Sequence, residues 1–264
     1  MVELTALIKS WFWFLKPSKV LFKGTGIYSN IKVTRRGDRT NLYTGKNYLQ
    51  TSVDNTVKPY GSYSDWFLAA PWLSGKFDGK IDSLLVLGLA GGTIVKDFNR
   101  YYSINKIAAV EIDPLIIELG KKYFELNDSN LTTINADAGS YFSATSEIYD
   151  LIIMDIFKEN VFDITCQSKG YFQELKKHLS AEGIVFINKL KSDPANIRLS
   201  ADLKEIFKNV ITLQIQDTLF FAATDSLSAP TTRNGVQDIF ITASKFNPDL
   251  KYFNHINPRS IGIV

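Results

Sequence analysis

The chain has 264 residues, of which 45% are hydrophobic and 22% charged, a composition typical of a soluble globular protein with a sizeable core. Its 30 basic and 27 acidic residues leave a net charge of +3, and the basic residues are scattered, so no surface for nucleic acid is indicated. The single cysteine excludes an internal disulfide, and the two histidines lie far apart without cysteine pairs, so no zinc-binding pattern is present. We therefore expect a cytoplasmic protein with a small-molecule partner, no metal and no nucleic acid.

The N-terminal stretch SWFWFLK, residues 10–16, carries four consecutive aromatic residues. Its apolar part is much shorter than the roughly 20 residues of a membrane-spanning helix, and no cleavage site of the signal-peptide type follows. We expect this stretch to pack on the protein itself or on a second subunit, with contact to a membrane surface as the alternative.

Residues 26–53 alternate β-branched or aromatic residues with polar ones, and the segments RGD at 36–38 and TGKN at 44–47 are typical of turns. This predicts a small antiparallel hairpin unit. Residues 63–74 have apolar positions at helical spacing, and the polar stretch KFDGKIDS at 76–83 follows. We predict two domains, an N-terminal segment with a small β-hairpin domain over 1–80 and a larger domain over 81–264.

The larger domain alternates buried strands with amphipathic helices. Strands are predicted over 83–88, 106–111, 132–135, 149–155 and 183–188, and helices over 93–102, 114–124, 139–144, 170–179 and 195–208. Runs such as LLVLG and GIVFIN are apolar on both faces, as strands of a helix-covered parallel sheet must be. The pattern predicts an α/β fold with a Rossmann-like doubly wound sheet. Two further strands near 210–216 and 237–243 are predicted to form an antiparallel hairpin at one sheet edge.

The first strand of this domain ends in a glycine cluster formed by Gly88, Gly91 and Gly92. Residues without side chains let the backbone approach a ligand and let the next helix start close to the sheet. A triphosphate-binding loop of the Walker type requires Lys followed by Ser or Thr after its last glycine, and Thr93-Ile94 does not provide them. The loop therefore indicates a nucleoside site.

Three acidic residues follow successive strands of the predicted sheet. Glu111 comes about twenty residues after the glycine loop, where a carboxylate accepts hydrogen bonds from both ribose hydroxyls. Asp137 is placed to accept from an adenine amino group, and Asp155 to project beside the reactive part of the ligand. For Asp137 the alternative is a helix N-cap, and for Asp155 a surface carboxylate. Nicotinamide dehydrogenases and S-adenosylmethionine-dependent transferases share this layout.

Segment 84–188 resembles the polyamine aminopropyltransferases, the spermidine synthase family, which has the class I methyltransferase-like fold. The resemblance lies in VLGLAGGT, VEIDP, ADA, YDLIIMD and GYFQELKKHLSAEGIVFIN, and more loosely in YSNIKV and TGKNYLQ. It implies a usually homodimeric transferase of polyamine biosynthesis that moves an aminopropyl group from decarboxylated S-adenosylmethionine to an amine. It further implies that Asp155 removes a proton from the attacking amine, and it adds Ala138 and Gln50 to the donor-binding residues.

Two positions depart from the family pattern. Gly91 stands where the family has an acid that meets the donor's amino group, and Lys158 stands where it has a second acid near the acceptor. A lysine repels a polycationic acceptor, and the absence of the loop acid removes the repulsion of the intact donor's carboxylate, which free backbone N–H groups could then receive. The alternatives are thus a methyltransferase that uses S-adenosylmethionine on the same scaffold, or a non-catalytic nucleoside-binding homologue. In the region of the family's Tyr-His-Glu segment, Tyr63 and Asp65 are the remaining polar candidates.

Overall fold

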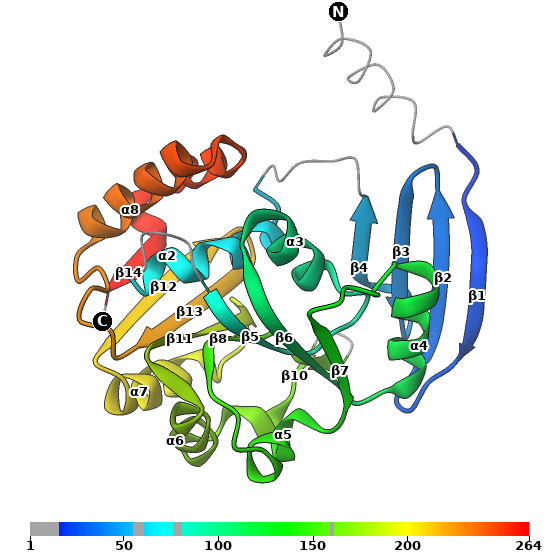
Figure 1. Ribbon diagram of the computed structural model, residues 1–264, viewed down its shortest axis with the longest axis horizontal. Coiled ribbons are helices and arrows are strands. Elements are labelled where there is room, and N and C mark those ends of the chain that lie inside the picture. The colour runs from blue at the N-terminus through cyan, green and yellow to red at the C-terminus, as the bar shows by residue number, and fades with distance from the viewer. Residues whose placement is uncertain (1–15, 55–60, 76–80, 159–160, 264) are drawn as a thin grey trace, which may run out of the picture.

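The computed structural model describes residues 16–54, 61–75, 81–158 and 161–263 (Figure 1). It contains an antiparallel four-stranded sheet built from the N-terminal part of the chain and a mixed eight-stranded sheet built from the rest. The aromatic residues at 11–14 lie outside the described residues, so the prediction for that stretch is not addressed. Within the described ranges, every helix is too short or too polar to cross a membrane.

The N-terminal sheet is a meander of β1 (Lys19–Thr25), β2 (Asn30–Arg36), β3 (Arg39–Thr44) and β4 (Tyr48–Asp54), in this order. The two predicted turns are confirmed, and each uses a glycine with positive φ, 60° at Gly37 and 54° at Gly45. The hairpin prediction is therefore correct, although it began at residue 26 and missed β1.

The large sheet has a parallel part and an antiparallel part. The parallel strands are β5 (Ile81–Leu87), β6 (Ile104–Glu111), β7 (Leu131–Asn135), β8 (Tyr149–Met154) and β11 (Leu179–Leu190), and β12 (Asn209–Ile215), β13 (Thr218–Thr224) and β14 (Ile261–Ile263) extend the sheet with antiparallel pairs. The spatial order is β14-β12-β13-β11-β8-β5-β6-β7. The chain reverses its direction of winding between β5 and β8, and such a switch point is where open α/β sheets bind ligands.

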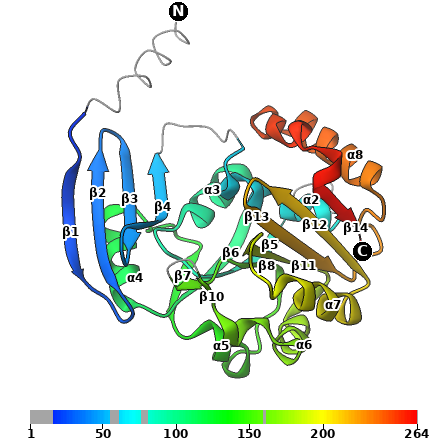
Figure 2. The same cartoon turned by 180° about the vertical axis from the view of Figure 1, so that it is seen from behind.

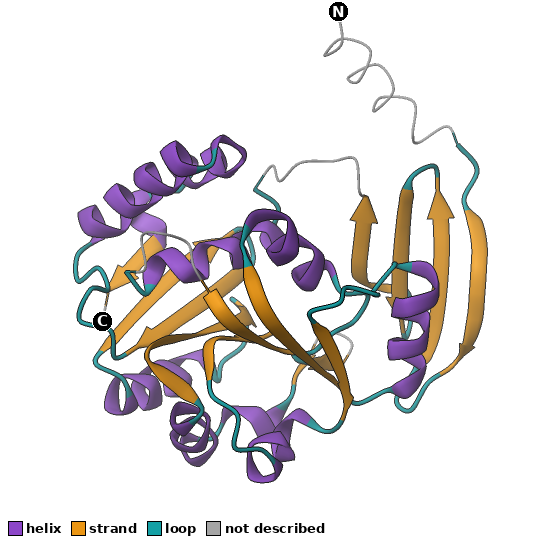
Figure 3. Ribbon diagram, in the orientation of Figure 1, coloured by secondary structure: helices purple, strands orange, loops and turns teal. Residues whose placement is uncertain are grey.

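Helices cover both faces of the large sheet, as Figures 2 and 3 show. One core layer contains residues of η2 (Tyr63–Ala69), α2 (Ala70–Leu73), α3 (Thr93–Tyr101), α4 (Pro114–Tyr123) and α8 (Arg233–Phe246), and the other contains residues of α5 (Ala138–Tyr141), α6 (Lys169–Lys177) and α7 (Asn196–Ile206). Alternate residues of β5 enter the two layers, Leu84 and Val86 the first, Leu85 and Leu87 the second. This arrangement confirms the predicted doubly wound α/β fold with a small antiparallel β unit.

Short elements complete the chain. They are η3 (Phe142–Ala144), the ribbon of β9 (Phe157–Lys158) and β10 (Val161–Phe162), η4 (Ile164–Gln167), η5 (Pro248–His255) and η6 (Pro258–Ser260). The N-terminal sheet is tied to α4, because Tyr123 Oη donates to the Leu21 carbonyl and the Ile27 N–H donates to Asp113 Oδ2, at 3.2 and 2.8 Å.

The predicted strand at 237–243 is wrong, because this segment belongs to helix α8. The partner of β12 is instead β13, which follows after Gln216 and Asp217 and pairs along its whole length. The segment is helical because Val236, Ile239, Phe240 and Ala243 share one buried face, while Ile241 is 43% exposed. An antiparallel hairpin thus exists, but it comes from a different segment and does not form the sheet edge, because β14 pairs with the outer side of β12.

The predicted division of the chain at residue 80 stays a prediction. Residues 63–73 precede that boundary, yet they pack in the core of the large sheet. Phe67 contacts Phe186 and Phe220, with ring centroids 6.1 and 5.3 Å apart. The small β unit alone accounts for residues 19–54.

Candidate functional site

The glycine loop sits at the carboxyl end of β5, directly beside the end of β8. The Asp155 N–H donates to the Leu87 carbonyl at 2.9 Å, so the two chain segments touch at this point. Gly88 has φ of 91°, and a Cβ atom there would lie 2.2 Å from the Asp155 carbonyl oxygen. Only glycine fits at position 88, and this close approach brings Asp155 to the loop.

Gly91 and Gly92 lie behind the loop surface rather than on a cavity wall. Gly92, with φ of 78°, is the N-cap of α3. The Gly91 N–H donates to Thr51 Oγ1 of β4 at 2.9 Å, and a Cβ at position 91 would lie 2.6 Å from Thr51 Cγ2. Thr51 therefore fills the space in which an acidic side chain at position 91 would begin.

A cavity of about 390 Å³, which we call the Glu111 cavity, opens beside this loop. Its walls combine the loop before β2, residues of β3 and β4, the ends of β5, β6 and β8, and the β9–β10 ribbon. Sequence-predicted site residues that line it are Gln50, Gly88, Glu111, Asp137, Ala138 and Asp155. The structure thus brings together six of the eight predicted site residues, and the exceptions are Gly91 and Gly92.

Glu111 is 9% exposed and accepts hydrogen bonds from the backbone. The Ala90 N–H donates to its Oε2 at 3.2 Å, and the Asp113 N–H donates to its Oε1 at 3.1 Å. Burial raises the pKa of Glu111, while the N–H groups of Asp113, Ala90 and Leu89 counteract this by stabilising the carboxylate. The result is a fixed acceptor at the base of the cavity, suited to paired hydroxyl donors.

The helix N-cap alternative holds for Asp137, although this residue also lines the Glu111 cavity. Asp137 Oδ1 accepts from the Gly139 N–H at 2.8 Å at the start of α5, and the side chain is exposed. Asp113 caps α4 in the same way, accepting from the Leu115 N–H at 3.0 Å. A capping carboxylate keeps a second oxygen, so capping and ligand contact are compatible at Asp137.

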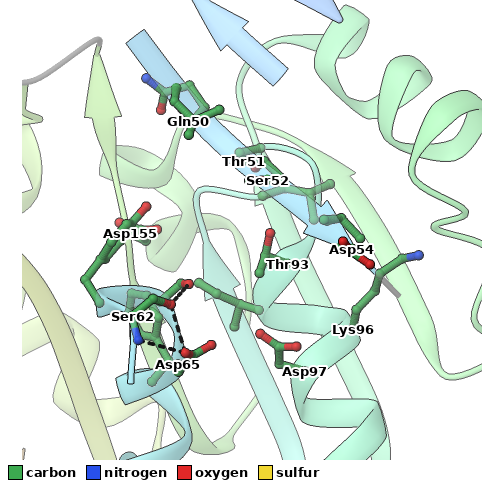
Figure 4. Close-up of a pocket in the computed structure, with 18 of the residues that line it drawn as sticks. Gln50, Thr51, Ser52, Asp54, Ser62, Asp65, Thr93, Lys96, Asp97 and Asp155 are labelled. Carbon is green, nitrogen blue, oxygen red and sulfur yellow. Dashed lines mark hydrogen bonds between the residues drawn. The ribbon is translucent and has the colours of Figure 1, made fainter. Parts of the chain in front are cut away.

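A second cavity, of about 340 Å³, lies on the other side of Asp155, and we call it the Asp97 cavity. Figure 4 shows its wall, with strand β4 above and helices η2 and α3 below. Four residues line both cavities: Gln50, Gly88, Ala90 and Asp155. The two cavities therefore share Asp155 as a wall residue, and its assignment to the site stays a prediction.

Asp155 is a shielded carboxyl group with one side-chain partner. Asn188, the polar residue near the end of β11, donates from Nδ2 to Asp155 Oδ1 at 2.8 Å. Burial raises the pKa of Asp155 to about 6, although the hydrogen bond from Asn188 lowers it. A carboxyl group with such a pKa is ionised at neutral pH and can still take up a proton.

The Asp97 cavity contains Asp65, which the sequence analysis named as a polar candidate, and Asp97, which it did not select. Asp65 accepts from the N–H groups of Gly61 and Ser62 at 3.0 and 2.8 Å. Burial and the charge of Asp65 raise the pKa of Asp97 to about 7, and Arg100 and Lys96 lower it by less. Asp97 lies one helical turn after Thr93, the first residue of α3, so both side chains are on the same face of the helix. This spacing was the signal in the sequence that could have identified Asp97.

Lys158 lines the Glu111 cavity and not the Asp97 cavity. Its Nζ lies 3.0 Å from Asp163 Oδ2 and 4.7 Å from the centre of the Tyr28 ring. The ion pair with Asp163 raises the pKa of Lys158 and offsets its charge. The charge from which the sequence analysis expected repulsion is therefore offset by the ion pair with Asp163. The described residues contain no cluster of three or more His, Cys, Asp or Glu side chains arranged for a metal ion.

Comparison with known proteins relates this arrangement to one family. The sequence matches the spermine/spermidine synthase domain over residues 73–224, more than half of the chain. It is 29% identical to a probable polyamine aminopropyl transferase of Bifidobacterium longum over 207 residues, which cover 76% of this chain and 45% of that protein. The chain thus spans about half the length of this relative.

Solved structures agree on the fold. A probable spermidine synthase from Corynebacterium glutamicum superimposes with a TM-score of 0.69 and 16% identity, covering 84% of this chain and 88% of the other. Human methyltransferase-like protein 13, in complex with SAH, gives a TM-score of 0.62 and 19% identity over 73% of this chain and 93% of its own. These similarities establish a fold that synthases and methyltransferases share, and together with the domain match they show that the chain belongs to the spermine/spermidine synthase family.

Proposed function

We propose that this protein transfers an aminopropyl group from decarboxylated S-adenosylmethionine to an amine. The observation that carries the proposal is the junction of two cavities at Asp155. In this assignment the Glu111 cavity receives the nucleoside part of the donor and the Asp97 cavity receives the acceptor amine. The family match of this chain and the name of the bifidobacterial relative support the same reaction.

The donor supplies a carbon bonded to a sulfonium, which is a good leaving group. The chain must supply a neutral amine, because an ammonium ion has no lone pair. Asp155 accepts one proton of the acceptor ammonium; the freed lone pair forms the new carbon–nitrogen bond, and the electrons of the broken carbon–sulfur bond stay on sulfur. The products are the extended amine and neutral methylthioadenosine, and Asp155 finally returns its proton to solvent.

The residues of the Glu111 cavity fit a nucleoside. In our assignment Glu111 accepts from the ribose hydroxyls and Asp137 accepts from the adenine amino group, while Gln50, Gly88 and Ala138 form the walls. Gly91 and Gly92 act indirectly, by allowing the turn that starts α3 close to the sheet.

The methyltransferase alternative has less support than the sequence suggested. It relied on loop N–H groups that could receive the carboxylate of intact S-adenosylmethionine. The Ala90 N–H donates to Glu111 and the Gly91 N–H donates to Thr51, so both are already used. The carboxyl groups of Asp65 and Asp97 in the adjoining cavity favour cationic groups instead.

Direct comparison of donors tests the proposal. We expect methylthioadenosine and decarboxylated S-adenosylmethionine to raise the melting temperature more than S-adenosylmethionine does, because ligands that bind the native state stabilise it according to affinity. Incubation of the decarboxylated donor with a panel of amines should release methylthioadenosine. Release of S-adenosylhomocysteine from the intact donor, with no methylthioadenosine from the decarboxylated one, would establish the methyltransferase instead.

The Asp97 cavity leads to a prediction about the acceptor. We expect Asp97→Asn to lower kcat/KM for 1,4-diaminobutane by about tenfold at pH 8.5, and to leave butylamine within about twofold, because only the diamine has a second ammonium for Asp97 to pair with. Since the pKa of Asp97 is about 7, the preference of the unmodified protein for the diamine should fade as the pH drops through 7.

The matched control for this prediction is Asp54→Asn. Asp54 lines the same cavity, but its Oδ2 lies 3.8 Å from Arg39 Nε, so an ion pair already engages its charge. A specific role of Asp97 is contradicted if Asp97→Asn lowers kcat/KM equally for the diamine and the monoamine. It is also contradicted if Asp54→Asn reduces the preference for the diamine as much as Asp97→Asn does.

The quaternary state and the cellular location belong to the same proposal. Family resemblance supports a homodimer that acts in the cytoplasm on small amines, without nucleic acid or membrane as partner. Light scattering coupled to gel filtration, at several protein concentrations, measures the mass of the assembly.

A further inference from the structure

Asn188 lies next to the proposed base, on the strand that borders it. Strand β11 pairs in parallel with β8, and Ile187 is opposite Met154, so Asn188 and Asp155 are the next residues of the two strands. Asn188 is only 5% exposed, and its Nδ2 donates to Asp155 Oδ1 at 2.8 Å. The contact is therefore a shielded hydrogen bond from a neutral amide to a carboxylate.

We propose that Asn188 is a positioning residue for the transfer reaction, which holds Oδ1 of Asp155 and leaves Oδ2 to accept the proton of the acceptor amine. The inference rests on the function proposed above. A carboxylate with one oxygen fixed by a rigid neighbour cannot rotate freely, so its second oxygen keeps one direction at the junction of the cavities. The hydrogen bond from Asn188 thus fixes the orientation of the Asp155 carboxylate and stabilises its charge.

The other end of the Asn188 amide supports a role in the site rather than in stability. Its Oδ1 is buried and has no hydrogen-bond partner among the residues that the structure describes. A buried carbonyl oxygen without a donor destabilises a fold, and an apolar residue of similar size would avoid this cost. The amide is therefore better explained by its contact with Asp155 than by packing.

Other titratable groups face Asp155 without a hydrogen bond to it. Tyr63, across the Asp97 cavity, is close enough for the charge of Asp155 to raise the Tyr63 pKa, although burial raises it more. The remaining ionisable groups on the walls of the two cavities are Arg39, Asp54, Asp65, Lys96, Asp97, Arg100, Tyr28, Glu111, Asp113, Asp137, Lys158 and Asp163. Burial and Asn188 are the two causes that set the pKa of Asp155, and Asn188 keeps it lower than burial alone would.

The test compares the pH dependence of kcat/KM in variants of two buried asparagines. We expect Asn188→Leu to move the acidic midpoint upward by about one pH unit, since one charge-assisted hydrogen bond is lost. Asn188→Asp has the same shape and places a second carboxyl group beside Asp155, so we expect a larger upward shift. Both variants should bind methylthioadenosine as the unmodified protein does.

Asn196 provides the matched control. It is 9% exposed, its Oδ1 is also buried without a partner in the described part of the chain, and its Nδ2 donates to the Leu190 carbonyl at 2.8 Å instead of to a side chain. We expect Asn196→Leu to leave the midpoint unchanged, whatever it does to the melting temperature. A structural effect of losing a buried amide would appear in both leucine variants.

The inference is overturned if the profiles of Asn188→Leu and Asn188→Asp superimpose on that of the unmodified protein. If Asn188→Leu does not fold, the aspartate variant decides. Titration of the Asp155 carboxyl carbon by NMR keeps the result separate from the proposed function. If the protein shows no aminopropyl transfer, the proposed function fails. A shift of the Asp155 titration in the Asn188 variants would still show that Asn188 controls the protonation of Asp155.

Discussion

Asp155→Asn is expected to lower kcat/KM for aminopropyl transfer by roughly 10²–10⁴-fold, the usual contribution of a positioned general base. An amide cannot take the proton from the acceptor ammonium, so only the small fraction of amine that is already neutral reacts. In the unmodified protein, kcat/KM should rise with pH through about 6, because the pKa of Asp155 is raised to that value and only the ionised form accepts a proton. Rates of methylthioadenosine release between pH 5 and 9 measure both effects.

Donor binding is the control for this prediction. Asp155→Asn keeps the shape of the side chain, so we expect the affinity for methylthioadenosine, measured by calorimetry, to change by less than about threefold. The kcat/KM that remains in this variant should also no longer show the rise with pH around 6. If the Asn variant retains both the rate and the limb, Asp155 is not the base.

Glu111→Gln is expected to weaken the binding of methylthioadenosine by about 10- to 100-fold. A hydrogen bond to a charged acceptor contributes about 1.5–3 kcal/mol, and the ribose would lose one or two of them. In the unmodified protein the N–H groups of Ala90 and Asp113 donate to the two carboxylate oxygens of Glu111. In the variant, one of these N–H groups faces the amide nitrogen, which cannot accept a hydrogen bond. We therefore also expect a lower melting temperature in the absence of ligand.

Asp137→Asn separates loss of binding from loss of the fold. Asp137 lines the same cavity, but it is exposed, so we expect a loss of affinity of about tenfold or less. Glu111→Asp keeps the charge on a shorter side chain, so its loss of affinity for methylthioadenosine should lie between those of Asp137→Asn and Glu111→Gln. An affinity of Glu111→Gln equal to that of the unmodified protein would remove Glu111 from the nucleoside site.

The parallel part of the fold could be predicted because its central strands β5, β6, β8 and β11 carry apolar runs and helices alternate with the strands. The C-terminal part could not be predicted in the same way. Residues 237–243 are rich in β-branched and aromatic side chains, but burial of Val236, Ile239, Phe240 and Ala243 on one face makes them helical. The hairpin before them turns at Gln216, with φ of 53°, and Asp217, a pair without the glycine that usually marks such turns.

Residues at strand ends could be found from the sequence, because the carboxyl ends of parallel strands converge on one edge. This rule places Gly88, Glu111 and Asp155 together, and it also applies to Asn188, near the end of β11. Contacts between segments far apart in the chain could not be found. The space beside Gly91 is taken by Thr51, 40 residues earlier, and no periodicity encodes such a pair.

The four residues shared by the two cavities also lead to a prediction about the kinetic order of the proposed reaction. Gln50, Gly88, Ala90 and Asp155 line both cavities, so in the proposed function donor and acceptor bind side by side at the same time and react directly with each other. A direct displacement needs no aminopropylated enzyme as an intermediate. Initial rates at varied concentrations of both substrates should therefore give intersecting reciprocal plots, and a transferred methylene made chiral with deuterium should emerge with inverted configuration.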